Sequence, residues 1–318
     1  MTIEKFSTNK AISSVRQNLY IEAATSDNTR RAYRSDIRHF EKWGGTLPSN
    51  VQTIIAYLHE HAETLNPRTL HRRMVAIRNW HVYLGHFDPN SDPLVKKTLV
   101  GIHHVHGKPK DKAPALTLEN LKKMVSYLKT KNTLQSYKDN VLVQVGFFGA
   151  FRRSELVAIR YDHIKFLNEG VEIEIPKSKI DQCRIGNVCA IPYGDEALCP
   201  VKALKRWLQE SKIKGGYIFP SCREKKSSTQ HIDVFGVNEM LKRVAKECGI
   251  GEPESFSGHS LRRGFATTAS QNGASMASIM RQGRWNNTAT VLEYIEESER
   301  FMENAVSTIL FKNKGVVG

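Results

Sequence analysis

One stretch limits what this chain of 318 residues can fold into more than any other. Residues 141–151 form an apolar run whose one polar member is Gln144, and such a run predicts a helix inside a core. Arg152, Arg153 and Glu155 follow it directly. A charge at the end of a buried helix must be paired or must serve a ligand. Glu155 stands three positions after Arg152, where it can hold that guanidinium, so we expect a cationic site here.

A second pair of basic residues lies far downstream. His259 and Arg262 are three positions apart on a predicted helix that ends near Asn272-Gly273, and they point the same way. Gly258 precedes them and leaves the backbone free to turn into the helix. Two donors on one face can seat a phosphate oxygen. By itself this spacing is more often an ordinary surface turn, so its meaning depends on the residues around it.

The N-terminal part predicts a small helical module with basic faces. Helix-opening signals stand at Asp27-Asn28-Thr29, Leu47-Pro48-Ser49 and Asn66-Pro67, with shorter helices expected over 15–24 and 93–100. Arg and Thr near helix starts can reach phosphates or base edges in a DNA groove. A single exposed Arg is as often merely solvated, so the clustering favours DNA. The expected contacts here are Thr29, Arg31, Arg34, Arg68, Thr69 and Arg72.

The composition then changes at the segment from His103 to Pro114, which lacks periodicity and holds a basic run. This is typical of an extended interdomain linker. Its histidines have no neighbouring Cys or carboxylate, so we do not expect a metal site. We therefore predict a helical DNA-binding domain over 1–106, a basic linker over 107–115 and a second domain over 116–318.

The second domain is predicted to be mainly helical with a small antiparallel sheet, an α+β fold. Residues 171–175 alternate as a strand and 187–192 return, with Lys177 and Lys179 near the hairpin tip. Helices are expected to open at Thr117 and Cys199, to cover 234–248 and to close at Asp162-His163-Ile164. Further helices follow around 277–280 and after Thr288, and an apolar stripe covers 301–310.

Composition narrows the class of partner and the compartment. The net charge is +15 and both halves of the chain are basic, which makes a nucleic acid the first partner to expect. The five cysteines are odd in number and form no C-x-x-C pair, which argues against a disulfide framework and a zinc site. There is no long apolar span and no signal peptide. We expect a soluble, cytoplasmic protein without a membrane partner.

The residues able to do chemistry follow one another in a recognisable order. They are Arg152, Lys179, His259, Arg262, Trp285 and Tyr294. The motifs that carry them are 149–156, 178–182, 258–262 and 283–285, with Tyr294 nine positions after Trp285. In this order the chain resembles the tyrosine recombinase (phage integrase) family and, within it, the Cre-like branch. It departs from the family at Trp285, where most members have His, and at Arg284, where Gly is common.

The resemblance implies a two-domain, C-shaped DNA clamp and a site-specific recombinase acting as a homotetramer on two double-stranded DNA sites. It implies cleavage and rejoining through a 3′-phosphotyrosine intermediate and a Holliday junction. Tyr294 would be the nucleophile, Arg152 and Arg262 the phosphate clamp, and Lys179 the general acid. His259 and Trp285 would add hydrogen bonds, Glu155 would support Arg152, and Lys177 and Arg284 would join the DNA contacts. No metal or other cofactor is expected, since the arginines supply the positive charge.

Three other functions stay open. The fold could serve a type IB topoisomerase-like enzyme, a telomere-resolving strand transferase or a catalytically silent DNA-binding protein. The stripe over 301–310 could fold back on its own domain or dock on a neighbouring protomer.

Overall fold

The computed structural model divides the chain into two compact units, Met1–Asp111 and Lys112–Gly318. The structure describes residues 25–109, 112–175, 187–221 and 230–299. Three predicted features lie outside these ranges: the helix over 15–24, the hairpin tip with Lys177 and Lys179, and the apolar stripe over 301–310.

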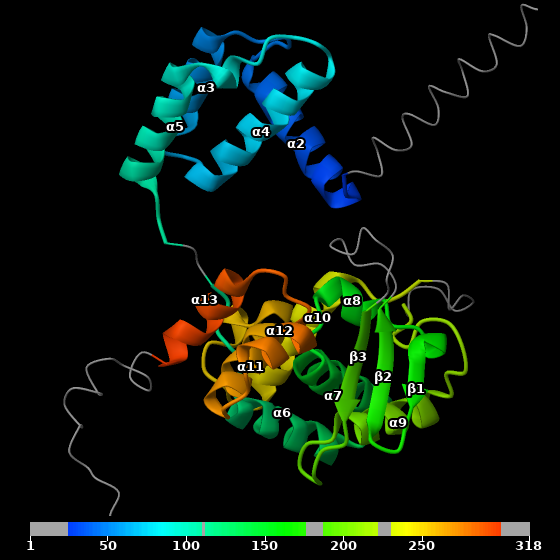
Figure 1. The fold of residues 1–318 in the computed structure, drawn as a ribbon. Coiled ribbons are helices and arrows are strands. Elements are labelled where there is room, and N and C mark those ends of the chain that lie inside the picture. The colour runs from blue at the N-terminus through cyan, green and yellow to red at the C-terminus, as the bar shows by residue number, and fades with distance from the viewer. Residues whose placement is uncertain (1–24, 110–111, 176–186, 222–229, 300–318) are drawn as a thin grey trace, which may run out of the picture. The chain divides into compact units, whose positions relative to one another are not determined.

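The described part of the first unit is built from four α-helices (Figure 1). They are α2 (Asp27–Trp43), α3 (Val51–His61), α4 (Pro67–Tyr83) and α5 (Pro93–His106). Each begins after a polar N-cap whose side chain accepts a backbone N–H, which satisfies a donor that the helix itself cannot pair. Their inward faces bury one core: Phe40, Ile54, Tyr57, Leu58, Leu70, Met74, Ile77, Val95 and Ile102.

Three details of this unit differ from the sequence prediction. Helix α3 begins at Val51, because Asn50 rather than the Leu47-Pro48-Ser49 stretch supplies the cap. Helix α5 continues past residue 100 to His106, since Ile102 is buried and anchors the extra turns. His103, His104 and His106 therefore belong to a helix and not to a linker. Leu84, expected in the apolar face of α4, lies beyond its last turn and is exposed.

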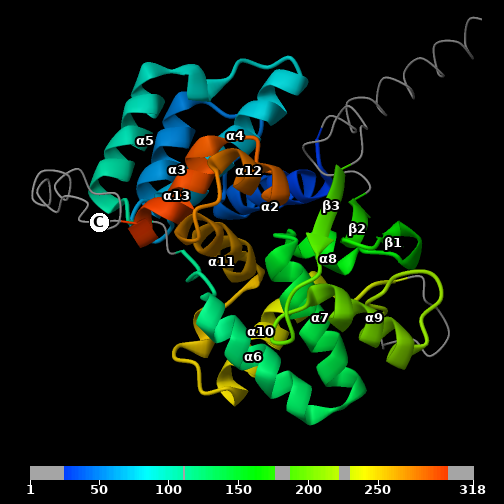
Figure 2. The ribbon, with the colours of Figure 1, turned by 60° about the horizontal axis from the view of Figure 1, so that its bottom comes forward.

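The second unit surrounds one central helix, α7 (Leu134–Phe148), which is buried along most of its length. Helices α6 (Leu118–Lys131), α9 (Pro200–Ser211) and α11 (Gly258–Gln271) pack against it. Helices α10 (Val234–Glu247), α12 (Met276–Gly283) and α13 (Thr288–Glu299) complete the helical body. Figures 1 and 2 show α11, α12 and α13 gathered on one side of this unit and the sheet on another. This arrangement brings the start of α11 and the end of α12 to the end of α7.

The sheet has three antiparallel strands in the order β1 (Ile164–Phe166), β2 (Gly170–Ile175) and β3 (Asn187–Pro192). In the register of the two longer strands, Ile173 lies opposite Cys189 and Val171 opposite Ile191. All four of these side chains are buried, which is the inward half of the predicted alternation. The predicted fold class, mainly helical with a small antiparallel sheet, is confirmed.

Some boundaries in this unit were predicted wrongly. No long helix reaches Ile164: α8 covers Arg153–Val157, and a 3₁₀ turn over Tyr161–His163 leads into β1. The backbone there bonds to a distant segment instead, since the N–H of Ile218 donates to the carbonyl of Ile159 at 3.0 Å. Helix α13 runs without interruption from Thr288 to Glu299. Within the described ranges, no helix is long and apolar enough to cross a membrane.

Candidate active site

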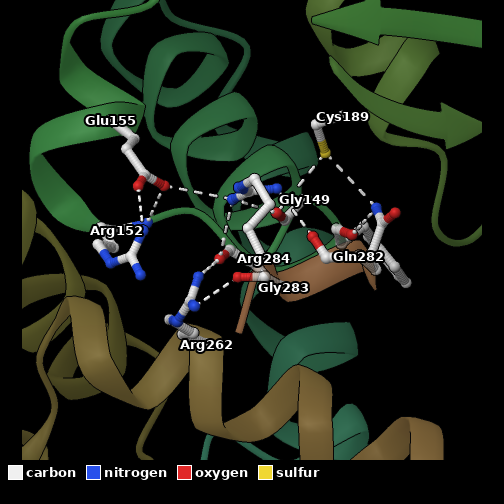
Figure 3. A network of polar contacts seen from close by, with 10 residues as sticks. Gly149, Arg152, Glu155, Cys189, Arg262, Gln282, Gly283 and Arg284 are labelled. Carbon is white, nitrogen blue, oxygen red and sulfur yellow. Dashed lines mark hydrogen bonds and ion pairs between the residues drawn. The ribbon is translucent and has the colours of Figure 1, made fainter. Parts of the chain in front are cut away.

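The site begins with a turn at the end of α7. Ala150 is fully buried and has a positive φ of 45°, which a residue with a side chain rarely adopts. The turn ends the helix three residues before the predicted end of the apolar run. It directs the carbonyl oxygens of Gly149 and Ala150 toward arginine side chains (Figure 3) and places Arg152 at the N-cap of α8. A strained, buried turn is thus held by cationic donors from other helices.

Arg152 is held by Glu155. Its Nη1 donates to Oε1 at 2.6 Å, and its backbone N–H donates to Oε2 at 2.9 Å. The Glu155 side chain is 8% exposed and that of Arg152 31%. Burial alone would raise the pKa of Glu155, but the amide and guanidinium of Arg152, with Arg284 nearby, hold that pKa below its usual range. The carboxylate is therefore ionised at neutral pH and can fix one side of the Arg152 guanidinium while another side stays partly exposed.

Arg262 lies deeper, with 3% of the residue exposed. It projects from the second turn of α11, and its two terminal nitrogens donate to the carbonyls of Ala150 and Gly283. Desolvation, together with the cations Arg152 and Arg284, lowers the pKa of Arg262 to about 9. The guanidinium is still charged at neutral pH. Because burial and the neighbouring cations disfavour the charged form, binding an anion would stabilise this guanidinium.

Arg284 is not where a DNA contact was expected. Its side chain is 8% exposed and points inward, where Nη2 approaches Glu155 Oε2 at 3.3 Å and the Gly149 carbonyl at 3.1 Å. Its Nη1 donates to the carbonyl of Gln282 at 2.8 Å. In this position the guanidinium belongs to the interior of the site and does not present a surface for a groove.

Trp285 and Tyr294 lie beside this network. Trp285 is 8% exposed, and the centre of its indole is 4.1 Å from the guanidinium carbon of Arg262. The rings of Trp285 and Tyr294 approach edge to face, with centroids 6.1 Å apart. Tyr294 is half-buried, and its helix is tied to α11 because Thr267 Oγ1 donates to the Tyr294 carbonyl at 3.0 Å. The structure thus brings Arg152, Arg262, Trp285 and Tyr294 together around the end of α7.

Two other catalytic residues were expected, His259 and Lys179. His259 is exposed in the first turn of α11, one turn before Arg262, after the Ser257 N-cap. Lys179, the expected general acid, and Lys177 lie outside the described residues.

The expected DNA contacts of the first unit divide into two groups. Arg31 and Arg34 are exposed on one face of α2, and Arg68 is exposed in the first turn of α4, where a groove surface can reach them. The Arg72 side chain is 51% exposed, and it also forms a bidentate pair with Asp36, both N–O distances being 2.8 Å, because Asp36 is only 2% exposed and needs a cation. Its first role is to join α2 to α4.

The two threonines of that set lie at helix starts, as predicted. Thr29 is half-buried, and its hydroxyl is 2.8 Å from that of Ser26, the N-cap of α2. Thr69 is half-buried in the first turn of α4, after the Asn66 N-cap. Both therefore sit beside backbone N–H groups that an anion can also approach.

One residue of the site was not predicted from the sequence. Gln282 Nε2 donates to the carbonyls of Phe148 and Ala190 at 2.9 and 3.1 Å, so it joins α12 to the end of α7 and to β3. An amide near a helix end carries no distinctive signal in a single sequence. Its role becomes visible only when three distant segments are seen together (Figure 3).

Known proteins resemble this chain in sequence. The family model described as "Phage integrase family" matches residues 114–300, and "Phage integrase, N-terminal SAM-like domain" matches residues 16–86. A Selenomonas ruminantium protein named integrase/recombinase xerD homolog is 36% identical over 303 residues, covering 92% of this chain and 88% of its own. Recombinase cre of Escherichia phage P1 is 23% identical, covering 80% and 77% of the two chains.

Solved structures are similar in fold. XerH site-specific recombinase bound to difH in a post-cleavage complex superposes with a TM-score of 0.63 at 18% identity, covering 86% of this chain and 76% of that one. The Tn1549 transposon integrase in complex with circular intermediate DNA gives a TM-score of 0.60 at 15% identity, covering 90% and 96%.

Proposed function

The chain belongs to the phage integrase family of tyrosine recombinases, and from this we propose that it cuts and rejoins duplex DNA at specific sites through a 3′-phosphotyrosine intermediate and a Holliday junction. This confirms two predictions made from the motifs, the family and the enzyme class, which is a tyrosine-type site-specific recombinase. The roles that we assign to individual residues in the reaction belong to the proposal.

The observation that carries the proposal is the pair of fixed guanidinium groups at the end of α7. Arg152 is oriented by Glu155, and Arg262 by the carbonyls of Ala150 and Gly283. Donors that are already oriented need no reorganisation when charge develops on a phosphate, and arginine stays charged through the reaction. Such a clamp stabilises the five-coordinate phosphorus, whose nonbridging oxygens carry extra negative charge.

The covalent step assigns one role to each remaining residue. The phenolic oxygen of Tyr294 attacks phosphorus, and the bond from phosphorus to the 5′ oxygen of the next nucleotide breaks. Lys179 gives that oxygen a proton, so it leaves as a hydroxyl, while His259 takes the tyrosine proton and can then donate a hydrogen bond to a nonbridging oxygen. Trp285 contributes an N–H donor but cannot move a proton. Attack by a 5′-hydroxyl on the phosphotyrosine reverses these bonds and seals a strand.

The substrate we propose is double-stranded DNA, with four protomers acting on two sites in the cytoplasm. The exposed arginines of α2 and α4 would contact phosphates and groove edges, alongside the catalytic unit. Of the proteins with a similar fold, XerH is bound to its difH substrate and the Tn1549 integrase is in complex with circular intermediate DNA, which supports a DNA substrate here.

A nicked suicide duplex tests the proposal. Covalent cleavage is first mapped over the DNA that flanks the gene, and the mapped site is placed in a duplex whose nick lets the cleaved end diffuse away. A recombinase traps a protein–DNA adduct on this duplex and exchanges strands between two intact duplexes. An adduct without exchange would favour a topoisomerase-like or telomere-resolving enzyme. Binding without an adduct would favour a silent DNA-binding protein and contradict the proposal.

A further inference from the structure

Arg284 combines two unfavourable features, a left-handed backbone conformation and a buried charge. It terminates α12 with a φ of 55°, a left-handed conformation that a side chain makes costly. Its guanidinium is nevertheless buried, and its Nε lies among the buried donors with no hydrogen-bond partner in the described residues. A glycine would satisfy the turn more cheaply. The arginine side chain therefore has a role other than forming the turn.

What it contacts is the support of the candidate clamp. Figure 3 shows the guanidinium of Arg284 directed toward Glu155 and toward the turn after α7. Glu155 Oε1 accepts from the Arg152 side chain, while Oε2 accepts both from the Arg152 backbone and from Arg284 Nη2, at 2.9 and 3.3 Å. Each carboxylate oxygen thus accepts at least one hydrogen bond, and Glu155 cannot rotate without losing a hydrogen-bond partner.

The same guanidinium reaches the second clamp arginine through a shared acceptor. The carbonyl of Ala150 accepts from Arg262 and, at 3.3 Å, from Arg284 Nη2. The neighbouring Gly149 carbonyl accepts from Arg284 at 3.1 Å. The centre of the Phe151 ring lies 4.8 Å from the Arg284 guanidinium carbon. Arg284 therefore touches both elements that fix the clamp, the carboxylate behind Arg152 and the turn behind Arg262.

We propose that Arg284 is a positioning residue of the cleavage reaction, which locks Glu155 so that the Arg152 guanidinium is held in register with Arg262 on the scissile phosphate. This inference rests on the proposed function, since it concerns the geometry of that clamp. In this role Arg284 touches neither the phosphate nor the tyrosine. Its contribution is orientation, together with a buried charge that balances Glu155.

Such a role predicts a loss in the chemical step and not in DNA binding. Removing the Arg284 side chain leaves the exposed basic surface intact, while Glu155 gains freedom and carries Arg152 with it. A displacement of about 1 Å in a catalytic group can cost on the order of a hundredfold in rate. The matched control is Arg281, an exposed arginine one turn earlier on α12 whose side chain forms no ion pair within the described residues.

The experiment measures single-turnover adduct formation on the nicked duplex that carries the site mapped with wild-type protein. We expect Arg284→Gln to slow it by about a hundredfold, Arg284→Lys to recover part of the rate, and Arg281→Gln to match wild type. The dissociation constant for the duplex should stay within about threefold in all of them, because their groove-facing arginines are unchanged. In a Glu155→Gln background, Arg284→Gln should add little further slowing, because its route to Arg152 is already cut.

Two results would overturn the inference. One is a wild-type rate of adduct formation for folded Arg284→Gln. The other is a double variant with Glu155→Gln whose rate is reduced by the product of the two single-variant factors. If Arg284→Gln does not fold, Arg284→Gly replaces it, because glycine suits the positive φ. Slow cleavage by folded Arg284→Gly supports the role, and a wild-type rate refutes it. A wild-type protein that forms no adduct anywhere contradicts the proposed function itself, whereas an active wild type with an equally active Arg284→Gln contradicts this inference alone.

Discussion

The guanidinium of Arg262 lies against the indole of Trp285, its carbon 4.1 Å from the ring centre. The residue two positions before Trp285, Gly283, accepts a hydrogen bond from the same guanidinium. The turn after α12 therefore holds Arg262 by a carbonyl on one side and an aromatic face on the other. In the proposed reaction we therefore expect Trp285 to act on the phosphate chiefly by orienting Arg262, in addition to the single N–H it can donate.

The clamp arginines give the first prediction. Arg152→Ala and Arg262→Ala should each slow adduct formation by at least about 10²–10³-fold, since each removes a preoriented donor that also carries full charge. Binding of the duplex should change little. Arg153→Ala is the neighbouring control, because the Arg153 guanidinium carbon lies 5.8 Å from the Phe235 ring and not beside Glu155. If Arg153→Ala were the variant that lost cleavage, the clamp would have been assigned to the wrong arginine.

The general acid can be tested with a sulfur-substituted strand. A 5′-bridging sulfur leaves without a proton, so Lys179→Ala should be slow on ordinary DNA and largely restored on the sulfur substrate. Rates of adduct formation on the two substrates measure this. Lys177→Ala serves as the comparison on the same hairpin, and it becomes the candidate if it alone is rescued. Equal defects of Lys179→Ala on both substrates would exclude the acid role.

The first unit should lose stability in mild acid because of two histidines. Arg73 donates to His39 Nδ1 at 2.8 Å, which requires that nitrogen to be unprotonated. Burial and then Arg73 lower the pKa of His39 and of His61, against a smaller opposing effect of Asp36 on His39. In the unfolded chain the histidine pKa is about 6.5, so below that pH the unfolded chain binds more protons than the folded one. Stability is thus full above about pH 6.5 and falls as the pH drops below it.

Urea unfolding of the full chain between about pH 7.5 and 5 measures this effect. His39→Gln and His61→Gln should flatten the dependence of the free energy of unfolding on pH. His59→Gln, on the exposed side of the same helix as His61, should leave the slope as in wild type. A slope unchanged by the first two substitutions would show that the histidines do not set it.

The sequence predicted the longer helices better than the short segments between them. Capping residues and the apolar run located most helices, because these signals are local. The β1 strand was missed, since its pairing with β2 determines it. The predicted helix was too long, because the backbone of residues 159–161 bonds to residues 216–218, distant in the chain. Arg72 and Arg284 were assigned to DNA as basic residues in basic surroundings. Their ion pairs with Asp36 and Glu155 could not be predicted from the sequence, because the burial of these two carboxylates decides that they must pair.

The apolar stripe over 301–310 predicts coupling between protomers. An apolar helix must bury its face, and docking on a neighbouring protomer would tie the position of Tyr294 to the state of that neighbour. Truncation after Arg300 should then leave binding to one site intact while cooperative assembly and strand exchange are lost, as gel shifts and exchange assays would report. A truncated protein that assembles and recombines normally would exclude docking, and one that unfolds would favour folding back on its own unit.

The central claim is that Tyr294 becomes covalently joined to DNA. The adduct trapped on the nicked duplex is digested with protease and nuclease, and the modified peptide is sequenced by mass spectrometry. We predict a nucleotide 3′-phosphate on Tyr294 in the wild type and no adduct with Tyr294→Phe, which should bind the duplex as tightly because only a hydroxyl is lost. An adduct that persists in Tyr294→Phe, or a nucleotide found on any other residue, would contradict the claim.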